Sequence, residues 1–174
     1  MPHQIPWLIL LLPFLAFVIN GVILRPFFPR QHRLAGYITI TAIGGAFLLS
    51  LWTLMAVMGT EGHKLEIPSV QWLSVGKVNV EIGLLIDSLT AVMLIVVTLV
   101  SLMVQIYSQG YMHGDPGYIR YYAFMALFTT FMLVLITSNN LLFMYLGWEG
   151  VGLCSYLLIG FWYHGRPGAK PGDT

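Results

Sequence analysis

The sequence has 174 residues, of which 57% are hydrophobic and only 9% are charged. Soluble domains carry about 25% charged residues, so this composition indicates an integral membrane protein and excludes an ordinary soluble domain. The formal net charge is +1 and the basic residues do not cluster, which argues against nucleic acid as a partner.

Five stretches are long and apolar enough to cross the lipid bilayer, which takes about 20 residues as a helix. Residues 1–6 contain no Lys or Arg, so the first stretch is interpreted as a retained helix rather than a cleaved signal peptide. Pro13 is expected to kink this helix. The sequence thus predicts an all-α polytopic membrane protein with spans at about 7–24, 35–58, 88–108, 121–137 and 141–163.

The basic residues divide unequally between the two sides of these spans. Six lie in the segments after the first, third and fifth spans, and two lie on the other side. The positive-inside rule then places the N-terminus outside and the tail after the fifth span in the cytoplasm, as in a multi-pass protein of the inner (plasma) membrane. The six are Arg25, Arg30, Arg33, Arg120, Arg166 and Lys170, and the two are Lys64 and Lys77.

The segment between the second and third spans has a different pattern. In "VGKVNVEIG", apolar and polar residues alternate with the period of two that is typical of a half-buried strand. "VQWLS" can pair with it across Gly76, which predicts a short β-hairpin at 65–86 on the outer membrane surface. The predicted organisation is therefore 1–64 (two spans and a loop), 65–86 (hairpin), 87–163 (three spans) and 164–174 (cytoplasmic tail).

Two helix starts carry polar residues that can act as caps. Asp87 immediately precedes the third span, a position that favours an N-cap role over a functional one. Only residues 138–140 join the fourth and fifth spans, so these two helices must form an antiparallel pair. Ser138 or Asn139 is the expected cap of the fifth span.

Glu149 is the exception among the five spans, since no other Asp, Glu, Lys or Arg lies inside them. Its place in the fifth span puts it near the middle of the bilayer, where an ionised carboxylate facing lipid costs at least several kcal/mol. One hypothesis is a proton carrier, loaded and unloaded by a cation that moves toward or away from it. The other is a structural acid that is permanently protonated or hydrogen-bonded across a helix interface.

Helical spacing of about 100° per residue divides the fifth span into two faces. Tyr145, Gly152 and Tyr156 share the face of Glu149, and the two hydroxyls are candidate hydrogen-bond partners. Small residues form a stripe opposite, where another helix can approach closely. This packing stripe consists of Gly147, Gly150 and Cys154, and Cys154 has no second cysteine in the chain with which to form a disulfide.

Other polar residues in the spans have a simpler interpretation. Ser, Thr and Gln105 are expected to hydrogen-bond to the backbone of their own helices. The five histidines are spread over separate loops, there is no CxxC and no glycine-rich nucleotide motif, so the sequence predicts no metal or cofactor site on this chain.

The run "NNLLFMYLGWEGVGLCSYLLIGFWY", residues 139–163, resembles the signature helix of subunit L of the proton-pumping NADH-quinone oxidoreductase, respiratory complex I. The preceding residues from "IDSLTAVML" onward and the hairpin "WLSVGKVNVEIGLLIDSL" resemble the same family, so the resemblance covers nearly the whole chain. Large subunits of multi-subunit cation/proton antiporters are the nearest alternative. Their motif usually reads more like WELTS than the Trp148-Glu149-Gly150-Val151-Gly152 of this sequence.

The resemblance implies a longer antiporter-like subunit built from two inverted five-helix repeats, each with one broken helix. In that scheme Glu149 matches the essential glutamate of the fifth helix, and its partner is a lysine on the broken helix two spans later. The sequence stops at Thr174, so this lysine is absent and the chain is expected to be a truncated form, inactive alone. NADH, FMN, iron–sulfur clusters and quinone would be bound by other subunits of the complex, whose membrane subunits would be the partners. A non-pumping membrane scaffold is the third interpretation.

Overall fold

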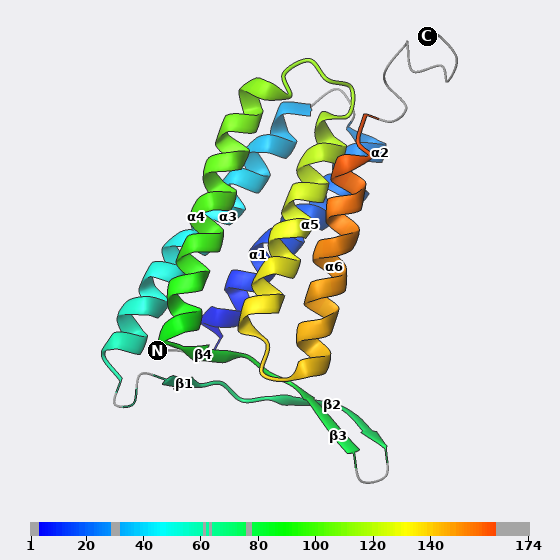
Figure 1. Cartoon of the computed structure of the whole chain (residues 1–174). Helices are drawn as coiled ribbons and strands as arrows, with labels where there is room; N and C mark the ends of the chain where they lie inside the picture. The colour runs from blue at the N-terminus through cyan, green and yellow to red at the C-terminus, as the bar shows by residue number, and fades with distance from the viewer. Residues whose placement is uncertain (1–3, 29–31, 61, 63, 76–77, 163–174) are drawn as a thin grey trace, which may run out of the picture.

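The computed structural model describes residues 4–28, 32–60, 62, 64–75 and 78–162, and its helices form one bundle with a small sheet at one end (Figure 1). The predicted tail at 164–174 and the turn at Gly76 lie outside these residues. Within the described residues, five helices are long and apolar enough to cross a membrane, which confirms the predicted fold class. They cover Ile5–Phe27, Arg33–Met58, Ser88–Tyr111, Tyr118–Thr137 and Leu141–Ile159.

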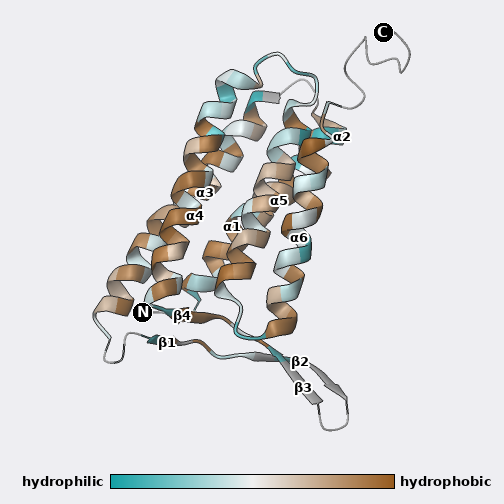
Figure 2. Ribbon diagram, in the orientation of Figure 1, coloured by the Kyte–Doolittle hydropathy of each residue, from teal (hydrophilic) through white to brown (hydrophobic). Residues whose placement is uncertain are grey.

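The helices pack in an order that leaves the last one at the edge of the bundle. Helix α1 (Ile5–Val18) packs on α3 (His32–Met58) and α5 (Tyr118–Thr137), while α4 (Ser88–Tyr111) packs on α3 and α5. Helix α6 (Leu141–Ile159) packs on α5 and forms one side of the bundle in Figure 1. Hydrophobic residues recur along the membrane-spanning helices (Figure 2), and many of their large hydrophobic side chains are exposed, as a lipid environment requires.

The first membrane span departs from α-helical geometry near its end. Residues Ile19–Leu24 form the π-helix η1, in which the Arg25 N–H donates to the carbonyl of Asn20, and the short helix α2 (Arg25–Phe27) follows. The residue expected to disturb this span, Pro13, lies inside α1, which continues as an α-helix to Val18. The irregularity therefore lies after the proline, at a buried asparagine.

Two antiparallel strand pairs lie at the end of the bundle where α6 begins (Figure 1). Strand β2 (Val70–Val75) pairs with β3 (Val78–Ile82), which confirms the predicted hairpin. A second pair, which the alternation did not predict, joins β1 (Lys64–Glu66) to β4 (Leu85–Asp87). The hairpin is thus closed at its base by a separate ladder that leads directly into α4.

The connection between α5 and α6 is tied to this sheet. Leu84 forms a β-bridge with Ser138, and the backbone and side chain of Asn139 bond the carbonyl and N–H of Gly83 at 3.3 and 3.2 Å. Asn140, rather than the predicted Ser138 or Asn139, caps α6, accepting from the Phe143 N–H at 2.8 Å. The prediction was wrong because the strand segment engages the first two residues and leaves Asn140 to cap the helix.

Asp87 caps α4 as predicted, with its carboxylate accepting from the Thr90 N–H at 2.8 Å. Hydrogen bonds from the Thr90 backbone and then from its side chain hold the pKa of Asp87 below the usual value, and Lys64 adds a weaker effect. A depressed folded-state pKa contributes stability that is present above about pH 4. That contribution is lost as the pH falls through the folded-state pKa.

We expect Asp87→Ala to lower the free energy of unfolding by about 1 kcal/mol at pH 7, because it removes the cap. Asp87→Asn is the matched control, since an amide oxygen still caps the helix but cannot titrate. Denaturant titration of the detergent-solubilised protein measures both. A wild-type loss of stability on acidification that persists unchanged in Asp87→Asn would contradict the role of this carboxylate in the pH dependence.

Candidate active site on helix α6

Helix α6 carries Glu149 close to its midpoint, as the ninth of 19 residues. The Asn140 cap fixes where the helix begins, and the cap therefore also fixes the depth of Glu149 along it. At the other end the Arg120 guanidinium donates to the carbonyl of Phe161 at 2.9 Å, just beyond the last helical turn. The acid thus lies half-way between two anchored helix ends.

The structure places the predicted packing stripe of α6 on the side of the helix that faces α5. Gly147, Gly150 and Cys154 are buried, and a Cβ atom built on Gly147 would lie 2.8 Å from the backbone nitrogen of Leu135. A Cβ atom on Gly150 would overlap the ring of Phe131. The close approach of the two helices therefore depends on the absence of side chains at these two positions.

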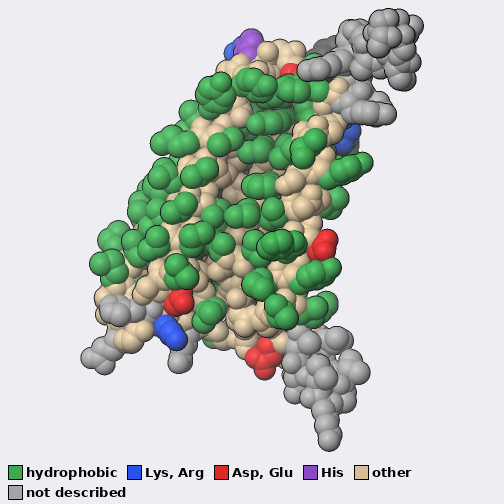
Figure 3. Space-filling model, viewed as in Figure 1, with side chains coloured by type: hydrophobic (Ala, Val, Ile, Leu, Met, Phe, Trp, Pro, Cys, Tyr) green, Lys and Arg blue, Asp and Glu red, His purple; other side chains and the backbone are tan. Residues whose placement is uncertain are grey.

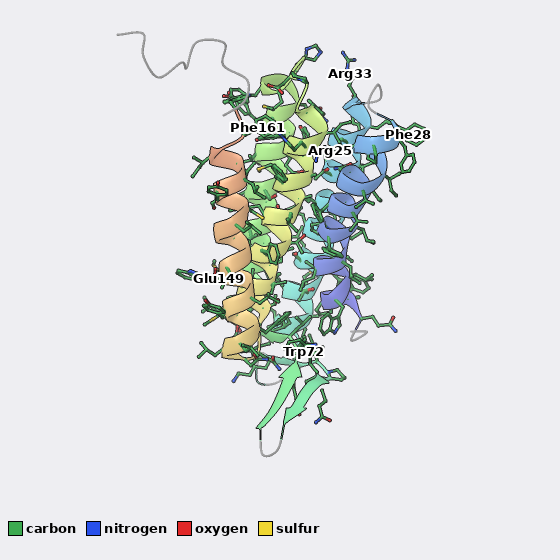
Figure 4. The ribbon with its side chains drawn as sticks, turned by 90° about the vertical axis from the view of Figure 1, so that its right-hand side faces the viewer. Arg25, Phe28, Arg33, Trp72, Glu149 and Phe161 are labelled. Carbon is green, nitrogen blue, oxygen red and sulfur yellow. The ribbon has the colours of Figure 1, made fainter. Side chains whose placement is uncertain are left out.

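Glu149 lies on the opposite face and is exposed. Figure 4 shows its side chain pointing away from the other helices, and Figure 3 shows an acidic patch among hydrophobic side chains part-way along α6. Tyr145 and Tyr156 share this face with exposed fractions of 59% and 74%, and a Cβ atom on Gly152 would meet nothing within 4 Å. The predicted supporting residues thus share one surface that the described part of the chain does not cover.

Tyr145 lies one helical turn before Glu149 on this surface, and its hydroxyl interacts with the Glu149 carboxyl. Beside the pair is a pocket of about 230 Å³ between α6 and the hairpin. Its lining includes Trp72, Ile82, Leu142, Phe143 and Leu146 in addition to Tyr145 and Glu149. This lining is largely apolar, with Asn140 as the other polar side chain beside the pair.

The chemistry available to these residues is proton exchange. The carboxyl group can accept and release one proton, and its tyrosine neighbour can donate a hydrogen bond to the charged form. Within the residues that the structure describes, no three His, Cys, Asp or Glu side chains come together as metal ligands would. The candidate site is therefore Glu149 with Tyr145 on the open face of α6.

Two buried amides inside the bundle make hydrogen bonds that the sequence interpretation did not predict. Asn20, fully buried, donates to the Thr39 hydroxyl at 2.7 Å and to the Ala35 carbonyl at 3.3 Å. Gln105 was expected to bond its own backbone, but its amide donates to the Ser101 hydroxyl at 3.2 Å. The sequence could have indicated these contacts, because an uncharged amide in a membrane span normally bonds another side chain or helix.

Gln105 belongs to a polar contact between α4 and α5. Ser101 is hydrogen-bonded to Thr129 at 2.6 Å, and the Tyr122 hydroxyl donates to the Gln105 carbonyl at 2.8 Å. The expectation for the hydroxyl residues is confirmed elsewhere, for example at Ser50 and Thr130, which bond carbonyls four residues earlier. These hydrogen bonds are made within the bundle and do not involve Glu149, which is the carboxylic acid on the open face of α6.

Two family models match separate parts of the chain. One is described as "NADH-Ubiquinone oxidoreductase (complex I), chain 5 N-terminus" and matches residues 72–122. The other, "NADH:quinone oxidoreductase/Mrp antiporter, TM", matches residues 138–168. The second match includes the whole of α6 and hence Glu149.

Curated relatives match nearly the whole chain. It is 40% identical over 173 residues to NAD(P)H-quinone oxidoreductase chain 5 of Synechocystis, a match that covers 96% of this chain and 25% of the relative. It is 44% identical over 156 residues to NADH-quinone oxidoreductase subunit L of Rickettsia conorii, covering 90% and 23%. The chloroplastic NAD(P)H-quinone oxidoreductase subunit 5 of Nephroselmis olivacea is 41% identical over 166 residues, covering 92% and 25%. The chain thus spans about a quarter of the length of these relatives.

Proposed function

The chain belongs to the subunit L/chain 5 family of NADH-quinone oxidoreductases, whose N-terminal part it matches, and on that premise we propose that it forms part of a proton-translocating membrane subunit. In this proposal Glu149 binds and releases the translocated proton in response to electron transfer from NADH to quinone elsewhere in the complex. The chain itself is proposed to hold no NADH, flavin, iron–sulfur cluster or quinone. Its partners are the other membrane subunits of the complex.

The observation that carries the proposal is the position of Glu149 on α6. The side chain is half-way along a membrane-spanning helix, points away from the bundle and has largely apolar neighbours (Figure 4). An ionised carboxylate left there in lipid would cost at least several kcal/mol. A protein of this kind therefore has a strong physical reason to cover the residue with further helices and to control its charge.

The length of the relatives indicates where the helices that cover Glu149 would come from. They are about four times as long as this chain, since it covers about 25% of them. We propose that helices corresponding to their remaining length pack on the open face of α6 and supply a cation near Glu149. The tyrosine hydroxyls at 145 and 156 would then lie in the contact between the two groups of helices.

The proton-carrier role is tested with Glu149→Gln in the assembled complex, by measuring proton movement and quinone reduction together. The proposal requires that electron transfer continues while proton movement per electron falls. Unchanged proton movement in assembled complex would refute it, and loss of assembly alone would support a scaffold role. Proton movement that is independent of NADH and quinone would instead favour a cation/proton antiporter, whose class shares the family description matched at residues 138–168.

The proposed orientation places the sheet outside the cell and the turn at residues 112–117 in the cytoplasm, by the distribution of basic residues. We expect a cysteine at Gln71 to react with an impermeant thiol reagent added to intact cells, and a cysteine at His113 to be protected. Both positions are exposed, and Cys154→Ala provides a background free of the native, buried thiol. Labelling at position 113 alone would reverse the orientation.

A further inference from the structure

A pocket of about 370 Å³ that contains two arginines lies at the end of the bundle opposite the sheet. Arg25 comes from α2, Asp115 and Gly117 come from the turn before α5, and Arg120 comes from the first turn of α5 itself. Phe161 and Trp162, which follow α6, complete the wall. Figure 4 shows Arg25 and Phe161 at the same end of the bundle as Arg33, and Trp72 at the other.

Arg120 is held in this wall by two contacts with Phe161. Its guanidinium donates to the Phe161 carbonyl at 2.9 Å, and its central carbon lies 4.6 Å from the centre of the Phe161 ring. The Nε atom is buried and has no hydrogen-bond partner among the residues that the structure describes. A buried donor without an acceptor is energetically unfavourable, so a ligand that brings a hydrogen-bond acceptor to Arg120 would stabilise the site.

The single acid of the pocket is already engaged. One carboxylate oxygen of Asp115 accepts from the Gly117 N–H at 2.7 Å, and the other accepts from the indole N–H of Trp162 at 3.0 Å. No salt bridge between Asp115 and either arginine occurs within the described ranges. Two guanidinium groups and one carboxylate leave the pocket with a formal charge of +1, which favours an anion.

The position of the pocket identifies the kind of anion. Arg25 lies near the end of the first membrane span and Arg120 near the start of the fourth, so both are at the level of lipid headgroups. Trp162 is 45% exposed and Phe28 is 49% exposed, which suits the boundary between headgroups and acyl chains. Basic pockets between membrane helices are suited to acidic lipid headgroups, and a volume of this size is in the range of small-molecule sites.

We propose that this pocket binds the phosphodiester group of an anionic glycerophospholipid from the surrounding leaflet. Arg25 and Arg120 donate to the phosphate oxygens, because a planar guanidinium matches their geometry. The acyl chains extend along the apolar surface outside the bundle. The bound lipid would connect the end of the first membrane span, the start of α5 and the residues that follow α6.

The proposal is tested by native mass spectrometry of the full chain purified from vesicles of phosphatidylglycerol or of phosphatidylcholine. We expect phosphatidylglycerol to remain bound and phosphatidylcholine to be lost. Arg25→Gln should weaken retention about fivefold, as expected for one basic residue near an anionic lipid. Arg25 is exposed, so its replacement does not disturb the packing of the bundle. Arg120 packs on Phe161, so the second variant is Arg120→Lys, which keeps the positive charge. The two variants together cover the case in which one of them fails to fold.

Arg33→Gln is the matched control, because Arg33 is at the same end of the bundle but its guanidinium contacts the His113 ring at 3.1 Å and lies outside this pocket. Equal losses of lipid in Arg25→Gln and Arg33→Gln would reduce the effect to general surface charge and overturn the proposal. Equal retention of the two lipids would also overturn it. Displacement of the bound lipid by millimolar inorganic phosphate would assign the pocket to a free anion rather than to a lipid.

Discussion

Glu149→Gln is expected to reduce proton transfer through α6 on the order of a hundredfold, while the helix and its packing are unchanged. Glutamine has nearly the same shape as glutamate but cannot exchange a proton, and a positioned acid or base typically contributes 10²–10⁴-fold to such a transfer. The side chain is on the face opposite the α5 contact, so its replacement does not disturb Gly147 or Gly150. Proton uptake by membrane vesicles during quinone reduction, measured in the proposed assembled complex, gives the result.

Three variants separate the chemistry of this position from its structure. Glu149→Asp keeps a titratable group and should retain part of the transfer, and Tyr145→Phe removes the hydroxyl that interacts with the acid and should cause a smaller loss. Glu81→Gln is the matched control, since Glu81 is an exposed acid on β3 outside the membrane spans. If Glu81→Gln lowers proton movement as much as Glu149→Gln does, the mid-span acid has no special role.

Gly147→Ala is expected to destabilise the contact between α5 and α6 by about 1–3 kcal/mol, the range for an overpacked interior. The added methyl group would lie 2.8 Å from the backbone nitrogen and 2.9 Å from the Cα of Leu135, and a helix backbone cannot move aside as a side chain can. The helices must therefore separate or tilt. Denaturant titration measures the loss of stability, and cross-linking between cysteines placed in α5 and α6 reports their distance.

Gly152→Ala is the matched control on the same helix. Nothing lies within 4 Å of the Cβ position of Gly152, and alanine is the better helix former by about 1 kcal/mol. This variant should therefore be as stable as the wild type or more stable. A Gly152→Ala variant that is destabilised as much as Gly147→Ala would show that α6 is covered on both sides in the protein tested, which is itself the arrangement proposed for Glu149.

Much of the fold follows from local sequence patterns. The five membrane helices come from the length of their apolar runs, because lipid imposes that length, and the β2–β3 hairpin comes from the alternation around Asn79. The Asp87 cap could also be predicted, since one acidic residue stands alone before the helix. In each case the deciding interaction joins residues that are close in the sequence.

The features that were missed depend on contacts between distant residues. Asn140 is the cap of α6 because Gly83 and Leu84, more than fifty residues earlier, engage Ser138 and Asn139. The β1–β4 ladder and the π-helix around Asn20 likewise need partners that no local period reveals. The surroundings of Glu149 could be predicted only in part, because the described chain provides its helix but leaves its open face uncovered.

The attachment of both ends of α6 limits how Glu149 can respond to a change of charge. At the start of the helix, Asn139 and Asn140 bond the backbone of Gly83 and Glu81, and past its end Arg120 bonds Phe161. A piston-like slide of the helix along its axis would break all of these bonds at once. Swivelling of the carboxyl group about its own χ angles breaks none of them. If Glu149 carries a proton as proposed, the distance over which it moves the proton is therefore limited to the reach of one glutamate side chain.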